Sequence, residues 1–75
     1  MTDIHFSILR YLADHPNTRK RSIAFALHTW TGYLVKPICE LEAAGYIKYT
    51  THTDPAQMEY YDTYELTEQG VQALL

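Results

Sequence analysis

Hydrophobic residues recur at the spacing of one helical face in three stretches of the first half of the chain. The predicted helices span residues 3–14, 19–28 and 32–44. The first helix also carries a second apolar stripe, with Phe6 and Leu9, which exceeds what one side of a small core needs. Pro16 ends this helix, because a proline disfavours helical backbone in the residue before it.

Capping residues and turn formers indicate where the second and third helices begin and end. We expect Asn17 or Thr18 to cap the second helix, with its side-chain oxygen accepting a free backbone N–H. Pro37 is tolerated if the third helix begins near Tyr33, because it then lies in or just past the first turn. Gly45 follows the last apolar position and is suited to the positive φ that ends many helices.

The hydrophobic period then changes to two, which is typical of strands. The predicted strands span residues 46–52 and 58–66, with turn residues 53–57 between them. This pattern predicts a hairpin with a longer loop, in which Ile47 and Tyr49 face inward. Thr67 is expected to cap a last short helix over residues 68–75. The predicted element order is α-α-α-β-β-α.

Composition and length favour a single globular domain over residues 1–75. A chain that is 47% hydrophobic and 20% charged is neither disordered nor of low complexity. It has no apolar run near the roughly 18 residues of a membrane span, and we expect no signal peptide. One cysteine, Cys39, cannot form an internal disulfide, which favours a reducing, cytoplasmic setting.

Charge is distributed unevenly, although the formal net charge is −3. Residues 18–53 hold five basic and two acidic residues, which gives this segment a charge of +3. The remainder holds one basic and seven acidic residues, which gives −6. A local basic patch, rather than the overall sign, decides whether phosphates are attracted.

Two short motifs resemble those of a known group of proteins. The runs LEAAGYI, residues 41–47, and YELTEQG, residues 64–70, resemble the paired signature of MarR and PadR transcription regulators and their small archaeal and phage relatives. Residues 31–47 are most similar to the PadR version. The resemblance implies an α+β winged helix-turn-helix, with a three-helix bundle, a two-stranded antiparallel hairpin and a short C-terminal helix. It also implies sequence-specific binding of double-stranded DNA, with the third helix in the major groove and the 46–66 hairpin as the wing.

The candidates for base reading lie around the start of the third predicted helix. They are Thr29, Thr31, Gly32, Tyr33 and Lys36. Hydroxyl and ammonium groups can bond base edges, and a glycine permits close backbone approach. Helix capping is the alternative for Thr31, and packing is the alternative for Tyr33. We expect Trp30 to lie in the core.

The candidates for phosphate contact are Arg19, Lys20, Arg21, Lys48 and His52. Three cations in the first turn of a helix oppose its dipole, which favours a use for them. The first helix of a helix-turn-helix crosses the DNA backbone, where such charges would meet phosphates. A merely solvated charge run is the alternative. The acidic side chains from Asp54 to Glu68 are expected to turn away from DNA.

Other classes of function find less support in the sequence. The four histidines show no metal-ligand spacing, and neither a phosphate loop nor a nucleophile elbow is present, so we expect no enzyme, metal or cofactor. One alternative class of function stays open, namely a winged-helix adaptor that binds protein rather than DNA. This interpretation is favoured if the basic residues scatter over several faces.

Assembly is the last expectation from the sequence. We expect a homodimer through the first and last helices, because one small module touches few base pairs and two half-sites raise affinity. The apolar residues available for this contact are Phe6, Leu9, Val71, Leu74 and Leu75. No membrane partner is expected, because no apolar run is long enough to span one. No small-molecule ligand is expected, because the chain lacks the extra helices that build a ligand pocket in longer family members.

Overall fold

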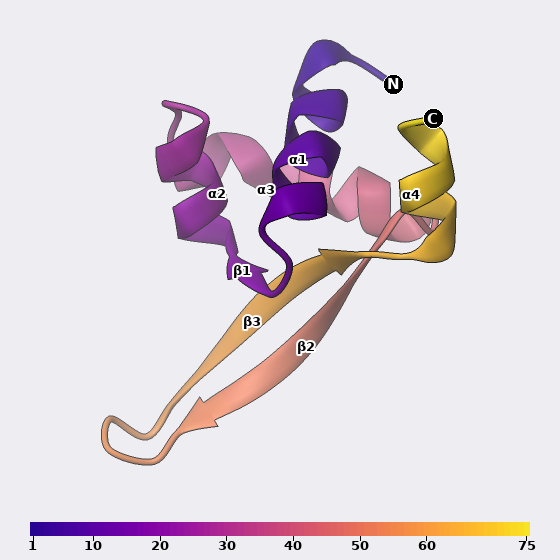
Figure 1. Ribbon diagram of the computed structural model, residues 1–75. Coiled ribbons are helices and arrows are strands. Elements are labelled where there is room, and N and C mark those ends of the chain that lie inside the picture. Colours follow the sequence, from indigo (N-terminus) through magenta and orange to yellow (C-terminus); the bar gives the residue numbers. More distant parts are fainter.

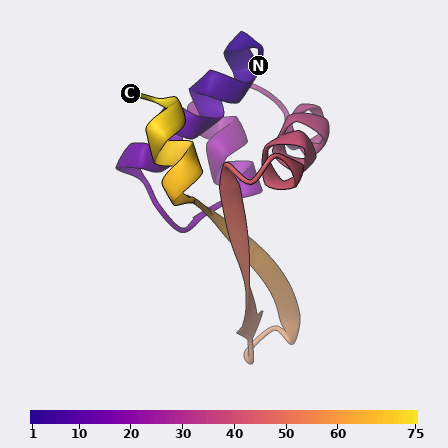
Figure 2. The ribbon, with the colours of Figure 1, turned by 90° about the vertical axis from the view of Figure 1, so that its right-hand side faces the viewer.

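The computed structural model describes residues 1–75 and contains four helices and a three-stranded sheet. The elements are α1 (Asp3–Asp14), β1 (Thr18–Arg19), α2 (Lys20–Ala26), α3 (Thr31–Ala43), β2 (Ile47–Asp54), β3 (Glu59–Leu66) and α4 (Glu68–Ala73). Figure 1 shows the helices gathered together, with the β2–β3 hairpin extending from them as a long arm. The view in Figure 2 shows that this arm twists as it leaves the helices. The α+β winged-helix fold expected from the sequence is confirmed.

The sheet is antiparallel throughout, in the order β1-β3-β2. Strand β2 pairs with β3 along its whole length, from Ile47 opposite Leu66 to Asp54 opposite Glu59. Strand β1 pairs with the other edge of β3, where Thr18 lies opposite Tyr64. The sequence predicted only the hairpin, so the third strand is an addition to that prediction.

The start of α2 corrects the predicted cap. Asn17 adopts a left-handed φ of 58°, whereas a capping residue needs extended backbone. The Thr18 hydroxyl donates to the carbonyl of His15, at 2.5 Å, and therefore points back along the chain. Arg19 occupies the N-cap position and makes no side-chain capping bond. Strand β1 thus takes the residues that the sequence assigned to the cap and first turn.

Pro37 also differs from its predicted position. Helix α3 begins at Thr31, so Pro37 lies in the helix interior rather than in the first turn. A proline there has no N–H for the carbonyl of Tyr33, four residues earlier. Its ring is buried among the core residues of α3, and this burial offsets part of the missing hydrogen bond.

The core combines side chains from the first three helices with two from the sheet. It consists of Ile8, Leu9, Leu12, Ile23, Ala24, Leu34, Ile38, Leu41, Ile47 and Tyr64. Leu9 is fully buried, which corrects the expectation that it belongs to a free interaction surface. The second apolar stripe of α1 is therefore partly a core stripe.

Two aromatic residues are more exposed than the sequence predicted. Trp30 is 75% exposed rather than in the core, and it occupies the extended N-cap position of α3. Tyr49 is 54% exposed, although it shares a sheet face with the buried Ile47. Its ring centroid lies 6.4 Å from that of the buried Tyr64 on β3, and beyond this pair the hairpin extends away from the helices (Figure 1).

The end of α3 and the start of α4 interlock, and we call this contact the α3–α4 junction. Gly45, with a φ of 83°, donates to the carbonyl of Glu42, while the Tyr46 N–H donates to the carbonyl of Leu41. This pair of bonds is the Schellman motif that a glycine allows at a helix end. The predicted role of Gly45 is confirmed.

Thr67 joins the two sides of the junction. Its hydroxyl donates to the Gly45 carbonyl at 2.5 Å and accepts from Gly70 N–H at 3.2 Å, and its own N–H donates to the carbonyl of Tyr46 at 3.0 Å. The predicted cap of the last helix is confirmed. Gly70 packs so closely on the Tyr46 carbonyl oxygen that an added Cβ would collide with it.

Two glycine substitutions compare a crowded position in the α3–α4 junction with a position that has free space around it. We expect Gly70→Ala to lower the free energy of unfolding by about 1–3 kcal/mol, because the collision involves backbone that cannot move freely. Gly32→Ala meets nothing within 4 Å and should raise stability by about 0.5–1 kcal/mol. Urea unfolding of both variants measures the difference. Equal stability of the two variants would contradict the described junction.

Candidate nucleic-acid interface

The three consecutive cations lie at a cleft between the helices and the sheet. Pairing of Arg19 with Thr63 brings the start of α2 beside β3. The resulting cleft has a volume of about 270 Å³ and is lined by Arg19, Lys20, Arg21, Thr31, Tyr61, Asp62 and Tyr64. It therefore unites the basic triplet with the first residue of α3. We call it the basic cleft.

Arg19 is held by an aromatic stack on the sheet. Its guanidinium carbon lies 3.7 Å from the centre of the Tyr61 ring, close enough for a cation–π contact. The His52 ring stacks on the same tyrosine, with centroids 5.0 Å apart, and bonds the Thr63 hydroxyl through Nε2 at 2.8 Å. A guanidinium stacked by its face keeps its N–H edge available for a phosphate. Arg19 and His52 could be predicted from the sequence as phosphate candidates, whereas the tyrosine that connects them could not.

Two other charged residues do not follow the expectation. Asp62 lines the basic cleft instead of turning away from it, and its carboxylate accepts a bond from the Thr51 hydroxyl at 2.7 Å. The pairing of β2 with β3 places Asp62 opposite Thr51, beside the cleft. The expectation from the sequence had rested on the charge of Asp62 alone. Lys48 is absent from the cleft lining and lies 3.6 Å from the Glu65 carboxylate. The structure thus does not bring Lys48 together with the triplet.

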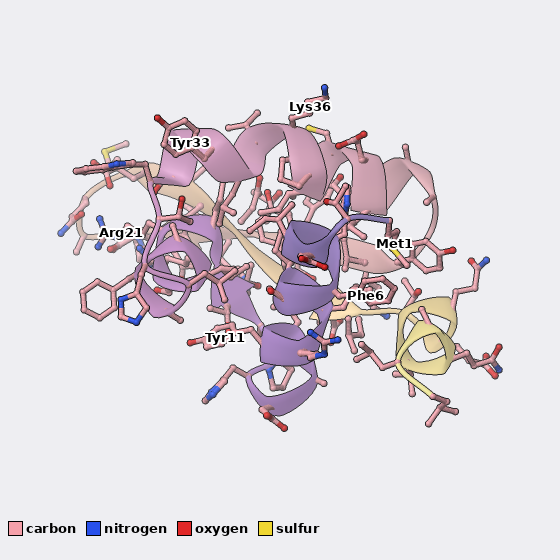
Figure 3. All side chains as sticks on the ribbon, turned by 90° about the horizontal axis from the view of Figure 1, so that it is seen from above. Met1, Phe6, Tyr11, Arg21, Tyr33 and Lys36 are labelled. Carbon is pink, nitrogen blue, oxygen red and sulfur yellow. The ribbon has the colours of Figure 1, made fainter.

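The base-reading candidates cluster on the exposed start of α3. Thr31, Gly32, Tyr33 and Lys36 are exposed, while Thr29 in the preceding turn is half-buried. In Figure 3, Tyr33 and Lys36 project outward from α3, away from α1. Thr31 is the first helical residue and not the cap, so its hydroxyl has no capping role. Tyr33 is 70% exposed, which removes packing as the explanation for it.

Tyr64 forms the floor where the basic cleft meets the core. Burial raises the pKa of Tyr64 to about 12, and the negative charges of Glu42 and Asp62 add to the rise. The phenol therefore stays neutral well above physiological pH. The chain has no group of three or more His, Cys, Asp or Glu side chains that could hold a metal ion.

Solved structures share this architecture. The repressor CouR bound to a 23-mer DNA duplex is 26% identical with a TM-score of 0.81, and the superposition covers 99% of this chain and 50% of that one. FabT from Streptococcus pneumoniae, in complex with DNA, is 15% identical with a TM-score of 0.83 and the same coverage. A MarR-family transcription regulator is 24% identical with a TM-score of 0.82, covering 99% and 47% of the two chains.

The chain therefore has the winged-helix fold of MarR-family transcription regulators. It spans about half the length of each of these proteins. The sequence matches no protein-family model and no curated protein. None of its helices is both long and apolar enough to cross a membrane.

The raised pKa of Tyr64 makes stability depend on alkaline pH. Above pH 10 the unfolded chain releases this proton, whereas the folded chain keeps it until about pH 12. The free energy of unfolding should therefore fall between these two values. Chemical unfolding across this range should show a smaller loss for Tyr64→Phe than for Tyr60→Phe, whose side chain is 77% exposed. Identical pH profiles of the two variants would contradict the assignment.

Proposed function

We propose that this chain binds double-stranded DNA sequence-specifically, as a cytoplasmic transcription regulator without catalytic activity. In this proposal α3 lies in the major groove and the β2–β3 hairpin acts as the wing. The observation that carries it is the basic cleft, in which the Arg19–Arg21 triplet adjoins the exposed start of α3. Cations beside a recognition helix can bind the phosphates that flank the major groove.

The arrangement of the charges supports DNA over the protein-adaptor alternative. Three of the six basic residues of an otherwise acidic chain share one cleft, and they adjoin Thr31 at the start of α3 rather than scattering. Lys36 extends from the same helix (Figure 3). CouR and FabT, which share the fold, are each bound to DNA in their solved structures, and this adds support.

In this proposal the loop of the wing contributes little to the attraction of DNA phosphates. This loop, residues 55–58, carries no basic residue, and the flanking Asp54 and Glu59 are acidic. Phosphate attraction must therefore come from behind the loop, where Tyr61 and His52 on the paired strands adjoin Arg19. We propose that Lys48, bound to Glu65, adds little.

Replacing Arg19, Lys20 and Arg21 together with Ala tests the proposed face. Affinity for a random duplex should fall, and the slope of log K against log salt should drop by about 1 for each phosphate that the variant no longer neutralises. Arg10→Ala is the control, because Arg10 lies outside the cleft and stacks on Phe6 of its own helix. Unchanged affinity and slope in the triple variant would favour the adaptor instead.

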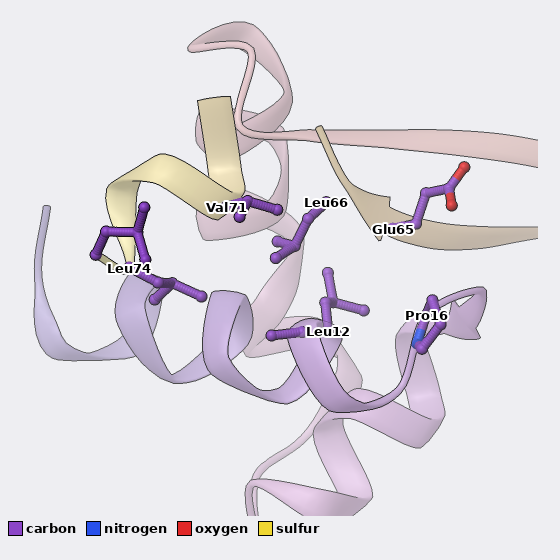
Figure 4. Close-up of a pocket in the computed structure, with 8 residues that line it drawn as sticks. Leu12, Pro16, Glu65, Leu66, Val71 and Leu74 are labelled. Carbon is purple, nitrogen blue, oxygen red and sulfur yellow. The ribbon is translucent and has the colours of Figure 1, made fainter. Parts of the chain in front are cut away.

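We also propose that the chain forms a homodimer through an apolar groove between α1 and α4. The groove has a volume of about 370 Å³ and is lined by Leu12, Ala13, Pro16, Glu65, Leu66, Val71, Leu74 and Leu75. Figure 4 shows Leu66 and Val71 in the space between α4 and α1, where Leu12 also lies. Val71 is 49% exposed and Leu75 is 97% exposed, which leaves apolar area for a second copy.

A charge placed in the groove should separate the copies. Val71→Glu should shift the sedimentation equilibrium toward monomer at high micromolar concentration, because a buried carboxylate at the interface is costly. Gln72→Glu adds the same charge at a neighbouring exposed position outside the groove lining and should leave the mass unchanged. A wild-type chain that is strictly monomeric at that concentration would contradict the dimer.

A further inference from the structure

The start of α3 exposes apolar and aromatic groups where a DNA-reading helix usually carries hydrogen-bonding side chains. Trp30 is 75% exposed, Tyr33 is 70% exposed and Val35 is 46% exposed. Gly32 stands between them, and the space where its Cβ would be is empty. Large aromatic side chains held this far into solvent gain nothing from folding, which indicates a surface that meets a partner.

Residues 29–44 contain few of the side chains that make paired hydrogen bonds with bases. They contain no arginine, asparagine or glutamine. Those residue types read guanine and adenine by paired hydrogen bonds in the major groove. Lys36 is the only cation of α3, and Glu40 lies 3.3 Å from Nε2 of His5 on α1. The hydrogen-bond donors that α3 can offer to bases are therefore limited to Lys36 and to hydroxyl or indole groups.

The major groove offers one apolar feature, the C5-methyl group of thymine. Aromatic and aliphatic side chains can contact this methyl, while a cytosine at the same position presents no such group. The empty space over Gly32 lets the helix backbone approach the groove floor, which brings the flanking aromatic rings within reach of base edges. The Arg19–Arg21 triplet beside Thr31 supplies the charge complementarity that favours DNA over a protein on this face.

We infer that Trp30 and Tyr33 determine sequence preference by contacting thymine methyl groups in the major groove. The inference rests on the proposed DNA binding and specifies what that binding reads. Lys36 adds a guanine or phosphate contact beside these positions. The preferred site therefore contains thymines at the positions under α3, and their methyl groups carry part of the affinity.

Deoxyuridine differs from thymidine only by the missing C5-methyl group, so its substitution measures the contribution of that methyl group alone. A preferred site is first selected from a random duplex pool, and each thymine in it is then replaced singly by deoxyuridine. We expect at least one position at which wild-type affinity falls by about three- to fivefold, the effect of one buried methyl group. Trp30→Ala or Tyr33→Ala should bind the thymine site more weakly and should no longer respond to deoxyuridine at its own position.

Tyr60→Ala is the matched control, since this exposed tyrosine lies near the hairpin tip and should keep the full response to deoxyuridine. Circular dichroism verifies that the variants, all at exposed positions, stay folded. Selective binding without any response to deoxyuridine would overturn the inference and leave DNA binding intact. The inference is also overturned, with DNA binding intact, if Trp30→Ala and Tyr33→Ala both bind and respond to deoxyuridine like wild type. The exposed aromatic residues would then be available for a protein partner. Failure of the wild-type chain to bind any duplex would overturn the inference and the proposed function together.

Discussion

The position of the hairpin depends on the hydrogen bonds that close the α3–α4 junction. Thr67 bonds the carbonyls of Gly45 and Tyr46, which follow α3, and it also caps α4 through Gly70. Both strands of the hairpin leave from this point, so the junction sets the direction of the whole arm relative to α3. A glycine is needed on each side, at one place for a left-handed φ and at the other for close backbone contact. The two motifs that look separate in the sequence are therefore halves of one contact.

The basic cleft follows from that geometry. Once β3 is fixed, its free edge binds β1, and β1 carries Arg19 to the ring of Tyr61. The residues of the cleft come from four elements and meet only because the sheet has three strands. A chain with an overall negative charge can in this way present a compact cationic surface. Five of the nine acidic residues lie in α3 and β3, which also contribute to the cleft, but Asp62 is the only acidic residue that lines it.

Periodic elements could be predicted from the sequence, whereas contacts between distant segments could not. The bounds of α1 agree with the prediction, because a regular apolar stripe and Pro16 define them. Strand β1 was missed because two residues have no period, and it exists only through pairing with β3. The exposure of Trp30 was missed for a related reason, since hydrophobicity alone does not place a residue in a turn. The stack on Tyr61 carries no sequence signal beyond the general enrichment in tyrosine.

The basic triplet and the start of α3 should respond to DNA as one face. Amide chemical-shift mapping of the labelled chain, titrated with a duplex, measures this response residue by residue. Shifts should concentrate in residues 19–21 and 30–36 and spread to His52 and Tyr61 through the stack, while the hairpin loop and the α4 face stay unchanged. Shifts confined to the α1–α4 groove or to the hairpin tip, with residues 19–36 unaffected, would contradict a DNA-binding face at the basic cleft.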